Sequence, residues 1–342
     1  MNAFILAGGA LVIDAFLGDP RLSFHPTRLM GRLAGLLESW LRRGTDTRGL
    51  FLKGLLGWLL VAGVSAGAAW GTLAGGRAIG AGIGGALGGA QGAGTAAAVG
   101  WWAAAIVLVY LSIAPRDLAA HALRVRRAMA GGGPGRNGGG LEEGRRAVSM
   151  IVGRDVDRLD AQGVIRACVE SVAESAVDGA AAPLFWAIAL GPVGAVAYRA
   201  VNTLDSMWGH RDERYLWFGK TAARMDDAAN WIPARLAFFA ACLAAAILGL
   251  DARSALRLGW RDRRAHASPN SGWLEAAFAG ALGIRLAGPA WYGGELTEKH
   301  WIGEARRDPE GADIDRSVRL MYATTLIFTA AMACAASIIP SG

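Results

Sequence analysis

Long uncharged stretches separated by short polar segments dominate this chain. Residues 95–114 carry no charge over the ~20 residues that a bilayer-spanning helix needs, and residues 320–339 share this pattern. Residues 54–74 and 232–250 are further candidates for such helices. The pattern predicts an all-α, polytopic integral membrane protein with about four to six membrane segments.

The first apolar run, residues 3–17, differs from a cleaved signal peptide. It contains Asp14 and lacks the basic region and the cleavage site that such a peptide carries. We therefore expect a retained first helix, with Asp14 facing the protein interior. His25, which precedes Pro26, is a candidate general base, although a lone histidine is more often structural.

Basic residues outnumber acidic ones, with 35 Lys and Arg against 28 Asp and Glu and a formal net charge of +7. They gather in residues 19–53 and 115–179, whereas Arg77 is the one charge between residues 75 and 94. The positive-inside rule places the two basic segments in the cytoplasm and residues 75–94 outside. The sequence shows no nucleic-acid-binding module, and its three cysteines form neither a metal-ligand motif nor a disulfide framework.

Residues 180–200 complicate this topology, because Pro183 and Pro192 interrupt an otherwise apolar segment. If residues 180–200 and 232–250 both cross the membrane, the polar block between them lies outside. We expect these two segments to be re-entrant or partly buried, since irregular backbone is tolerated where it lines a protein cavity. All the acidic blocks would then lie on one side.

Residues 75–100 consist almost entirely of Gly and Ala. Small residues at this density let membrane helices approach closely. Gly80, Gly82 and Gly85 match the spacing of a dinucleotide fingerprint, but no strand precedes them, so we reject that interpretation. Residues 131–140 (GGGPGRNGGG) predict a flexible cytoplasmic linker.

Arg166, Glu170, Glu174 and Asp178 recur every four residues in a segment with helical character. Because four residues exceed one helical turn by about 40°, the four side chains form one slowly drifting stripe. A solvated face with Arg–Glu pairs would explain it. The apolar residues that follow instead direct the stripe towards the membrane surface, where three carboxylates repel one another unless a cation or several arginines neutralise them. Oxygen ligands of this kind suit Mg²⁺.

A second acidic block comprises Arg224, Asp226, Asp227 and Asn230. At spacings of three and four residues, the last three present oxygen ligands on one helical face, and we expect Trp231-Ile232-Pro233 to end or kink that helix. Charges at a membrane interface are the simpler alternative. Paired acidic helical motifs also occur in enzymes that bind prenyl diphosphates through Mg²⁺, so that chemistry stays open.

Two further polar clusters border apolar segments. Asn202 and Asp205 either cap a helix or bind a phosphate or an activated carboxylate. Ser268 and Asn270 precede an apolar helical run, whose first amide groups can bind an anion or simply receive an N-cap. Arginine forks bind phosphate oxygens in pairs, although each arginine here is individually more often a structural ion-pair partner.

Several blocks in the same order resemble the adenosylcobinamide-phosphate synthase family of cobalamin biosynthesis, the CobD/CbiB type. The blocks that carry the resemblance are Asp14-x-x-x-Gly18-Asp19-Pro20, His25-Pro26, Glu170-Ser171-x-x-Glu174-x-x-x-Asp178, Ala182-Pro183-Leu184-Phe185, Asn202-Thr203-Leu204-Asp205-Ser206-Met207, Ala223-Arg224-x-Asp226-Asp227-x-x-Asn230-Trp231-x-Pro233-Ala234-Arg235, Ser268-Pro269-Asn270-x-Gly272-Trp273 and Ala276-Ala277-Phe278-Ala279-Gly280-Ala281-Leu282. Ser175 stands where the family typically has Asn. The resemblance covers nearly the whole chain, which we expect to form a single membrane-embedded domain, residues 1–342.

The resemblance implies an ATP-dependent acid–amine ligase that joins aminopropanol, or its phosphate, to a propionate carboxylate of adenosylcobyric acid. It implies ATP and Mg²⁺ as cofactors, the corrinoid and the amine as partners, and an inner-membrane protein with its active site on the cytoplasmic side. An association with itself or with other membrane proteins of the pathway is possible. The amine identity, aminopropanol, its phosphate or threonine phosphate, stays open.

Residue type and motif position suggest roles for the candidates. Asp205, Asp227 and Glu174 are the catalytic candidates; Glu170, Glu174, Asp178, Asp226 and Asp227 are the metal ligands; and Arg154, Arg166, Asn202, Arg224, Arg235, Ser268 and Asn270 bind substrate or phosphate. Two rival functions remain: a Mg²⁺-dependent membrane prenyl-type transferase, and a non-catalytic sensor or transporter similar to the AmpE-like branch of the family.

Overall fold

The computed structural model describes residues 2–20, 22–44, 46–131, 139–210 and 212–338. These residues are mostly helical, and they gather in two compact units. Unit 1 contains the described residues up to Ala114, Ala182–Ala229 and those from Thr329 onward, and unit 2 contains Pro115–Ala181 and Asn230–Phe328. Each unit thus combines distant parts of the sequence. The all-α membrane class predicted from the sequence is confirmed.

Unit 1 is built on one very long helix. Its elements are α1 (Ala3–Leu17), α2 (Pro26–Leu41), α3 (Thr47–Tyr110), α7 (Ala182–Trp208), the start of α8 (Lys220–Ile247) and the end of α11 (Gly311–Ile338). Helix α3 packs against α1, α2 and α7. The apolar core includes the fully buried Trp208, whose ring contacts Phe218 edge-on at 4.9 Å between centroids.

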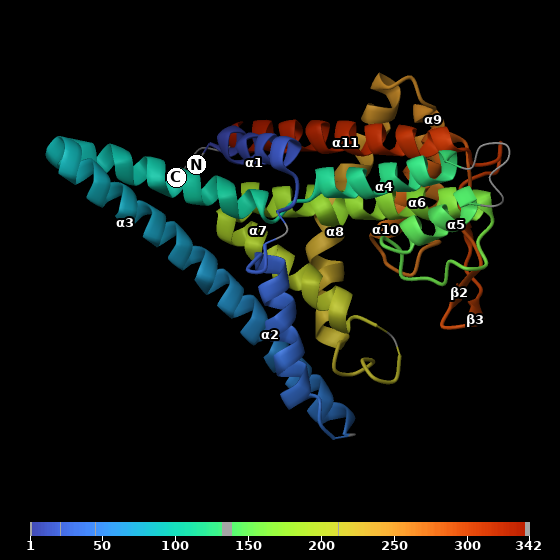
Figure 1. Cartoon of the computed structure of the whole chain (residues 1–342), viewed down its shortest axis with the longest axis horizontal. Helices are drawn as coiled ribbons and strands as arrows, with labels where there is room; N and C mark the ends of the chain where they lie inside the picture. The colour runs from blue at the N-terminus through green and yellow to red at the C-terminus, as the bar shows by residue number, and fades with distance from the viewer. Residues whose placement is uncertain (1, 21, 45, 132–138, 211, 339–342) are drawn as a thin grey trace. The chain divides into compact units, whose positions relative to one another are not determined.

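Helix α3 is a hairpin that turns in the middle of the Gly/Ala-rich stretch (Figure 1). The backbone leaves helical geometry at Gly88 and Gly89, and the φ of +63° at Gly89 favours glycine. Gly76, Gly80 and Gly84 on one arm face residues 100, 96 and 92 on the other. A Cβ atom added at Gly80 would lie 2.1 Å from the carbonyl oxygen of Ala96. The prediction that small residues let helices approach closely is confirmed, and residues 75–94 form this hairpin.

Helix α7 is interrupted, as the prolines predicted. Gly191 has a φ of +76°, and Pro192 follows it inside the helix. Asn202 and Asp205 belong to the last turns of α7, which continues to Trp208, so the helix-capping alternative for this cluster is wrong. The hydroxyl groups of Thr203 and Ser206 donate to carbonyl groups one turn earlier.

Helix α8 continues past Pro233 to Ile247, so of the two predicted outcomes, an end or a kink, the end is wrong. Pro233 has no N–H to donate to the carbonyl of Ala229, four residues earlier. The indole Nε1 of Trp186 donates to that carbonyl at 3.1 Å instead. Because the released acceptor has a partner, the proline removes one backbone hydrogen bond without leaving a buried carbonyl unsatisfied.

Unit 2 surrounds a short, almost fully buried helix. Its elements are α4 (Pro115–Ala130), α5 (Gly139–Val148), α6 (Ala161–Ala176), a π-helix η1 (Val177–Ala181), most of α8 and α11, α9 (Ala252–Asp262), α10 (Ser271–Leu282), β1 (Leu286–Ala287), β2 (Ala290–Tyr292), β3 (Glu295–Thr297) and β4 (Trp301–Ile302). Helix α10 packs against α9 and α6. Antiparallel pairing joins β1 to β4 and β2 to β3.

Four helical segments in the described residues are long and apolar enough to cross a membrane: Thr47–Ala130, Ala161–Trp208, Lys220–Ile247 and Gly311–Ile338. The chain is therefore a multi-pass α-helical membrane protein. These segments contain residues 54–74 and 95–114 completely and most of 232–250 and 320–339, and α1 is the helix expected over residues 3–17. The re-entrant topology and the assignment of sides stay predictions. The proposed linker at 131–140 lies mostly outside the described residues, and Gly139 and Gly140 begin α5.

The hairpin of α3 provides a matched pair of glycines for testing its packing. We expect Gly80→Ala to lower the stability by about 1–3 kcal/mol, because the new Cβ overlaps the opposite backbone. Gly82 has nothing within 4 Å of its added Cβ, so Gly82→Ala should leave stability equal or raise it through helix propensity. Thermal unfolding in detergent, followed by tryptophan fluorescence, compares the two. Equal effects would contradict the close contact.

Candidate functional site

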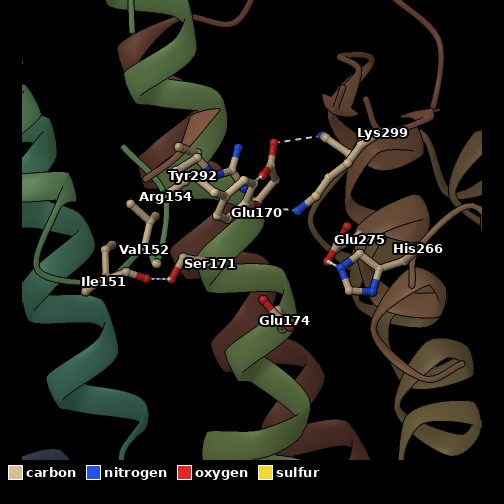
Figure 2. A pocket seen from close by; sticks show the side chains of 13 residues that line it. Ile151, Val152, Arg154, Glu170, Ser171, Glu174, His266, Glu275, Tyr292 and Lys299 are labelled. Carbon is tan, nitrogen blue, oxygen red and sulfur yellow. Dashed lines mark hydrogen bonds and ion pairs between the residues drawn. The ribbon is translucent and has the colours of Figure 1, made fainter. Parts of the chain in front are cut away.

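A polar cavity of about 250 Å³ lies within unit 2 (Figure 2). Helix α6, the segment between α5 and α6, the segment before α10, α10 itself and the β1–β4 region all contribute to it. The residues that line it are Ile151, Val152, Gly153, Arg154, Ala167, Glu170, Ser171, Glu174, His266, Glu275, Ala287, Tyr292 and Lys299. The cavity thus brings together three carboxylates and two permanent cations.

Contacts with the β2–β3 hairpin hold the segment that carries Arg154. The backbone N–H of Asp155 donates to the carbonyl of Trp291 at 2.8 Å. The Asp155 carboxylate accepts from the backbone of Gly293 and Gly294, and the Arg158 guanidinium lies 3.8 Å from the centroid of the Trp291 ring. These contacts fix one wall of the cavity without using the groups that face into it.

Glu170 joins three parts of unit 2. One oxygen forms an ion pair with Arg154, and the other accepts the backbone N–H of Ala287 at 2.7 Å. Its neighbour Ser171 donates to the carbonyl of Ile151 at 2.7 Å. Since both carboxylate oxygens of Glu170 already accept, this residue suits a structural role better than the metal-binding role predicted for it.

The side chains of Glu174, His266 and Glu275 converge beside α6, one helical turn after Glu170 (Figure 2). One ligand atom from each lies within 4.8 Å of the others. Glu174 accepts from the hydroxyl group of Ser271 at 3.2 Å, and Glu275 Oε1 lies 3.7 Å from His266 Nε2. Among the described residues, these three side chains form the group whose ligand atoms lie close enough together to hold a metal ion.

The tautomer of His266 follows from its backbone contact. Its Nδ1 accepts the backbone N–H of Ser268 at 3.0 Å, so the proton of the neutral ring resides on Nε2. A protonated Nε2 faces Glu275 and has no lone pair for a metal ion. The geometry therefore favours His266 as a donor towards carboxylate oxygens.

Burial and neighbouring charge set the electrostatics of the cavity. Burial raises the pKa of Glu275 well above its ordinary value, and the carboxylates of Glu174 and Glu170 raise it further. Burial also lowers the pKa of His266, which agrees with a neutral ring. For Arg154, burial opposes the charged form, but the Glu170 carboxylate outweighs it and raises the pKa. Lys299 donates to the hydroxyl oxygen of Tyr292 and supplies the other cation.

A chain of contacts leads from the cavity to three residues predicted from the sequence. Ser268 accepts the backbone N–H of Asn270 at 3.2 Å, and the Asn270 side chain accepts from Arg235 at 3.1 Å. Asn270 occupies the N-cap position of α10, as expected, but without a side-chain capping bond. Arg235 also lies over Trp231 and Trp273, at 4.2 and 5.3 Å from the ring centroids.

The predicted stripe on α6 separates into different environments. Glu170 and Glu174 line the cavity, whereas Arg166 lies 5.1 Å from the centroid of the Trp301 ring. Asp178 belongs to the π-helix η1 and is not among the residues that line this cavity. The π-turn could not be inferred from spacing.

The remaining candidates lie in unit 1. Asn202 donates to Asp226 at 3.3 Å and so links α7 to α8. A second cavity, of about 310 Å³, is lined by Lys220, Arg224 and Asp227 together with Gly209, His210, Tyr215, Leu216, Trp217, Gly219 and Ala223. Its loop is fastened to α2, because Tyr215 and Arg214 both donate to Glu38, at 2.9 and 2.7 Å. The backbone carbonyl of Asp205 accepts a hydrogen bond from the N–H of Gly209 at 2.6 Å.

The N-terminal candidates have structural surroundings. Asp14 is buried, as expected from its place on an apolar helix. His25 precedes α2, and its Nε2 lies 3.0 Å from Asp19. This pairing agrees with the structural interpretation of a lone histidine.

Sequence reasoning missed His266, Glu275, Tyr292 and Lys299. One signal was present: Glu275 is the single charged residue in the apolar run 271–282, where burial of a carboxylate requires a reason. The other three had none, because they come from loops or short strands without regular spacing.

The Arg154–Glu170 pair gives a stability prediction. Arg154→Ala leaves the buried Glu170 carboxylate without its cation, so we expect a loss of about 3 kcal/mol or more. Adding Glu170→Gln to that variant should recover part of the loss. Arg158→Ala, on the exposed stacking arginine, serves as the matched control. Thermal unfolding measures all three, and an Arg154→Ala effect no larger than that of the control would contradict the pairing.

The raised pKa of Glu275 predicts how stability depends on pH. The folded protein retains this proton to a higher pH than the unfolded chain, whose carboxyl titrates near 4.5. Stability is therefore lost as pH rises from about 4.5 towards the folded pKa. Melting temperatures between pH 5 and 8 should fall less for Glu275→Gln than for wild type. Parallel curves would show that Glu275 is charged in the folded protein.

Comparisons with known proteins agree on the family. A family model described as CobD/Cbib protein matches residues 7–321. A cobalamin biosynthesis protein CobD of Photorhabdus laumondii is 42% identical over 313 residues, 91% of each chain, and one of Yersinia enterocolitica is 43% identical over 319 residues, 93% of each. A cobalamin biosynthesis protein CbiB of Salmonella typhimurium is 40% identical over 327 residues, 95% of each.

No solved structure matches the chain. The matches to the family and to its curated members extend over nearly the whole length, and they include the blocks that build both cavities. The chain therefore belongs to the CobD/CbiB family of cobalamin biosynthesis.

Proposed function

We propose that this protein is an ATP-dependent acid–amine ligase that attaches aminopropanol phosphate to a propionate carboxylate of adenosylcobyric acid. The observation that carries the proposal is the polar cavity of unit 2, where Glu174 and Glu275 lie close to Lys299 and Arg154. The family membership supports the pathway. The cavity supports a reaction on a small, charged substrate. We place this active site on the cytoplasmic side of the inner membrane.

The chemistry requires activation of an unreactive carboxylate. In the route we propose, a carboxylate oxygen attacks the γ-phosphorus of ATP, which releases ADP and forms an acyl phosphate. The amine nitrogen then attacks the acyl carbon, phosphate leaves, and the proton of the amine passes to a base. Glu174 is our candidate base, since its carboxylate lines the cavity and the one hydrogen bond that it accepts among the described residues, from Ser271, leaves acceptor capacity.

We propose that the cavity of unit 1 binds phosphate groups. Lys220 and Arg224 line it, and the first turn of α8 directs its backbone N–H groups away from the helix. Asp226 and Asp227 offer oxygen ligands, which fit Mg²⁺ because that ion commonly binds one or two carboxylates together with substrate phosphates. When bound, Mg²⁺ offsets charge on a transferred phosphoryl group. Asp205 and Asn202 lie on α7, and Asn202 holds Asp226 in place.

The assay uses purified protein in nanodiscs with adenosylcobyric acid, aminopropanol phosphate and Mg-ATP, followed by mass spectrometry. We expect wild type to form the amide and to consume one ATP per product. Glu174→Gln should reduce kcat at least 100-fold, the usual minimum contribution of a positioned base. Glu295→Gln, an exposed position on the nearby hairpin, is the matched control and should keep wild-type rates.

Two results would contradict this proposal. One is folded wild-type protein that forms no amide with aminopropanol phosphate, aminopropanol or threonine phosphate. The other is amide formation that is independent of ATP. The first result would favour the transferase or sensor alternatives, which need no corrinoid.

A further inference from the structure

Glu275 is placed where a carboxylate is costly. It lies on α10, between Leu274 and Ala276, and it is 3% exposed. No hydrogen bond to its carboxylate is found among the described residues, and its nearest cationic candidate, His266 Nε2, lies 3.7 Å away. A buried carboxylate without hydrogen bonds is unfavourable unless a ligand satisfies it. Its side chain lines the cavity, so such a ligand has access.

The neighbours of Glu275 indicate the charge of that ligand. Glu174 is the second carboxylate in reach, and one oxygen atom of each lies within 4.8 Å of the other. Two carboxyl groups at this distance cannot both carry a negative charge at low cost, and a bound cation between them allows both to do so. His266 turns a protonated Nε2 towards them, so it adds no lone pair for a metal ion. A primary ammonium group needs acceptors alone, and both carboxylates supply them.

The other charges of the cavity fit the opposite end of a small zwitterion. Lys299 and Arg154 line the same space, and Lys299 is held by the hydroxyl group of Tyr292. An ammonium nitrogen binds phosphate oxygens as a compact point charge. At about 250 Å³, the cavity is smaller than the ~300–1,000 Å³ that enclose drug-sized ligands. A corrin ring is excluded, whereas a phosphorylated amino alcohol of three carbons is not.

We propose that this cavity is the subsite for the amine substrate, with Glu275 as the positioning residue that receives the ammonium group together with Glu174, and with Lys299 at the phosphate. The assignment rests on the proposed ligase function. It locates one substrate of that reaction, and it gives Glu275 the role of orienting the nitrogen, while Glu174 removes the proton.

Binding experiments without ATP or corrinoid test the subsite separately from turnover. Calorimetric titration of protein in nanodiscs uses two probes: aminopropanol phosphate and its deamino analogue, propanediol phosphate. We expect the deamino analogue to bind at least tenfold more weakly. Glu275→Gln keeps the shape of the side chain but cannot become the carboxylate that pairs with the ammonium group, so it should weaken binding of aminopropanol phosphate at least tenfold and leave binding of the deamino analogue unchanged.

A second variant tests the other end of the cavity. Lys299→Met should weaken binding of both probes by a similar factor, because it removes the contact proposed for the phosphate, which both probes carry. In the kinetic assay, Glu275→Gln should raise the KM for the amine at least tenfold and leave the KM for ATP unchanged. A merely structural Glu275 would change both KM values or neither.

Three outcomes would overturn the assignment. Glu275→Gln could weaken both probes equally, or it could leave the amine KM unchanged. It could also change the affinity for Mg²⁺ or Mn²⁺, titrated alone, without changing that for the amine; this would make the cluster a metal site. Selective amine binding in wild type without amide formation would instead retain the subsite and reject the ligase.

Discussion

The burial of carboxylates in an apolar, helical protein is the constraint on which unit 2 depends. Glu170 satisfies it through Arg154 and the backbone of Ala287, and this arrangement ties α6 to the segment before it and to β1. Glu275, by contrast, has a neutral histidine nearby and no hydrogen bond among the described residues. Glu170 thus links the segments that form the cavity, whereas Glu275 faces into the cavity and is free to pair with a bound cation.

Compensating contacts also explain how the membrane helices accept proline and glycine. Because Pro233 has no N–H, the carbonyl of Ala229 lacks its helical donor, and the indole of Trp186 donates to it instead. Helix α8 continues through the proline. The glycines of α3 replace side-chain packing with close backbone approach, since Gly76, Gly80 and Gly84 face the returning arm of the same hairpin. In each case a local departure from an ideal helix is compensated by one specific contact.

The sequence predicted much of this because apolar length and small-residue density are local properties. The spans and the close packing of the Gly/Ala-rich helices followed from them, whereas the family followed from the order of the motif blocks. Glu170 and Glu174 were predicted together because a helical period links them. His266 and Lys299 reach the same cavity through a loop and the end of a short hairpin, and no period connects such positions. The π-helix η1 has no signature in the spacing, and the contact between Trp186 and the carbonyl of Ala229 beside Pro233 joins residues 43 positions apart in the sequence.

A cryo-EM structure of the protein in nanodiscs with aminopropanol phosphate would test the amine subsite directly. We expect density for one small molecule in the cavity of unit 2, with its nitrogen against Glu174 and Glu275 and its phosphate against Lys299. Density for the amine phosphate elsewhere, with a metal ion between Glu174 and Glu275, would contradict it.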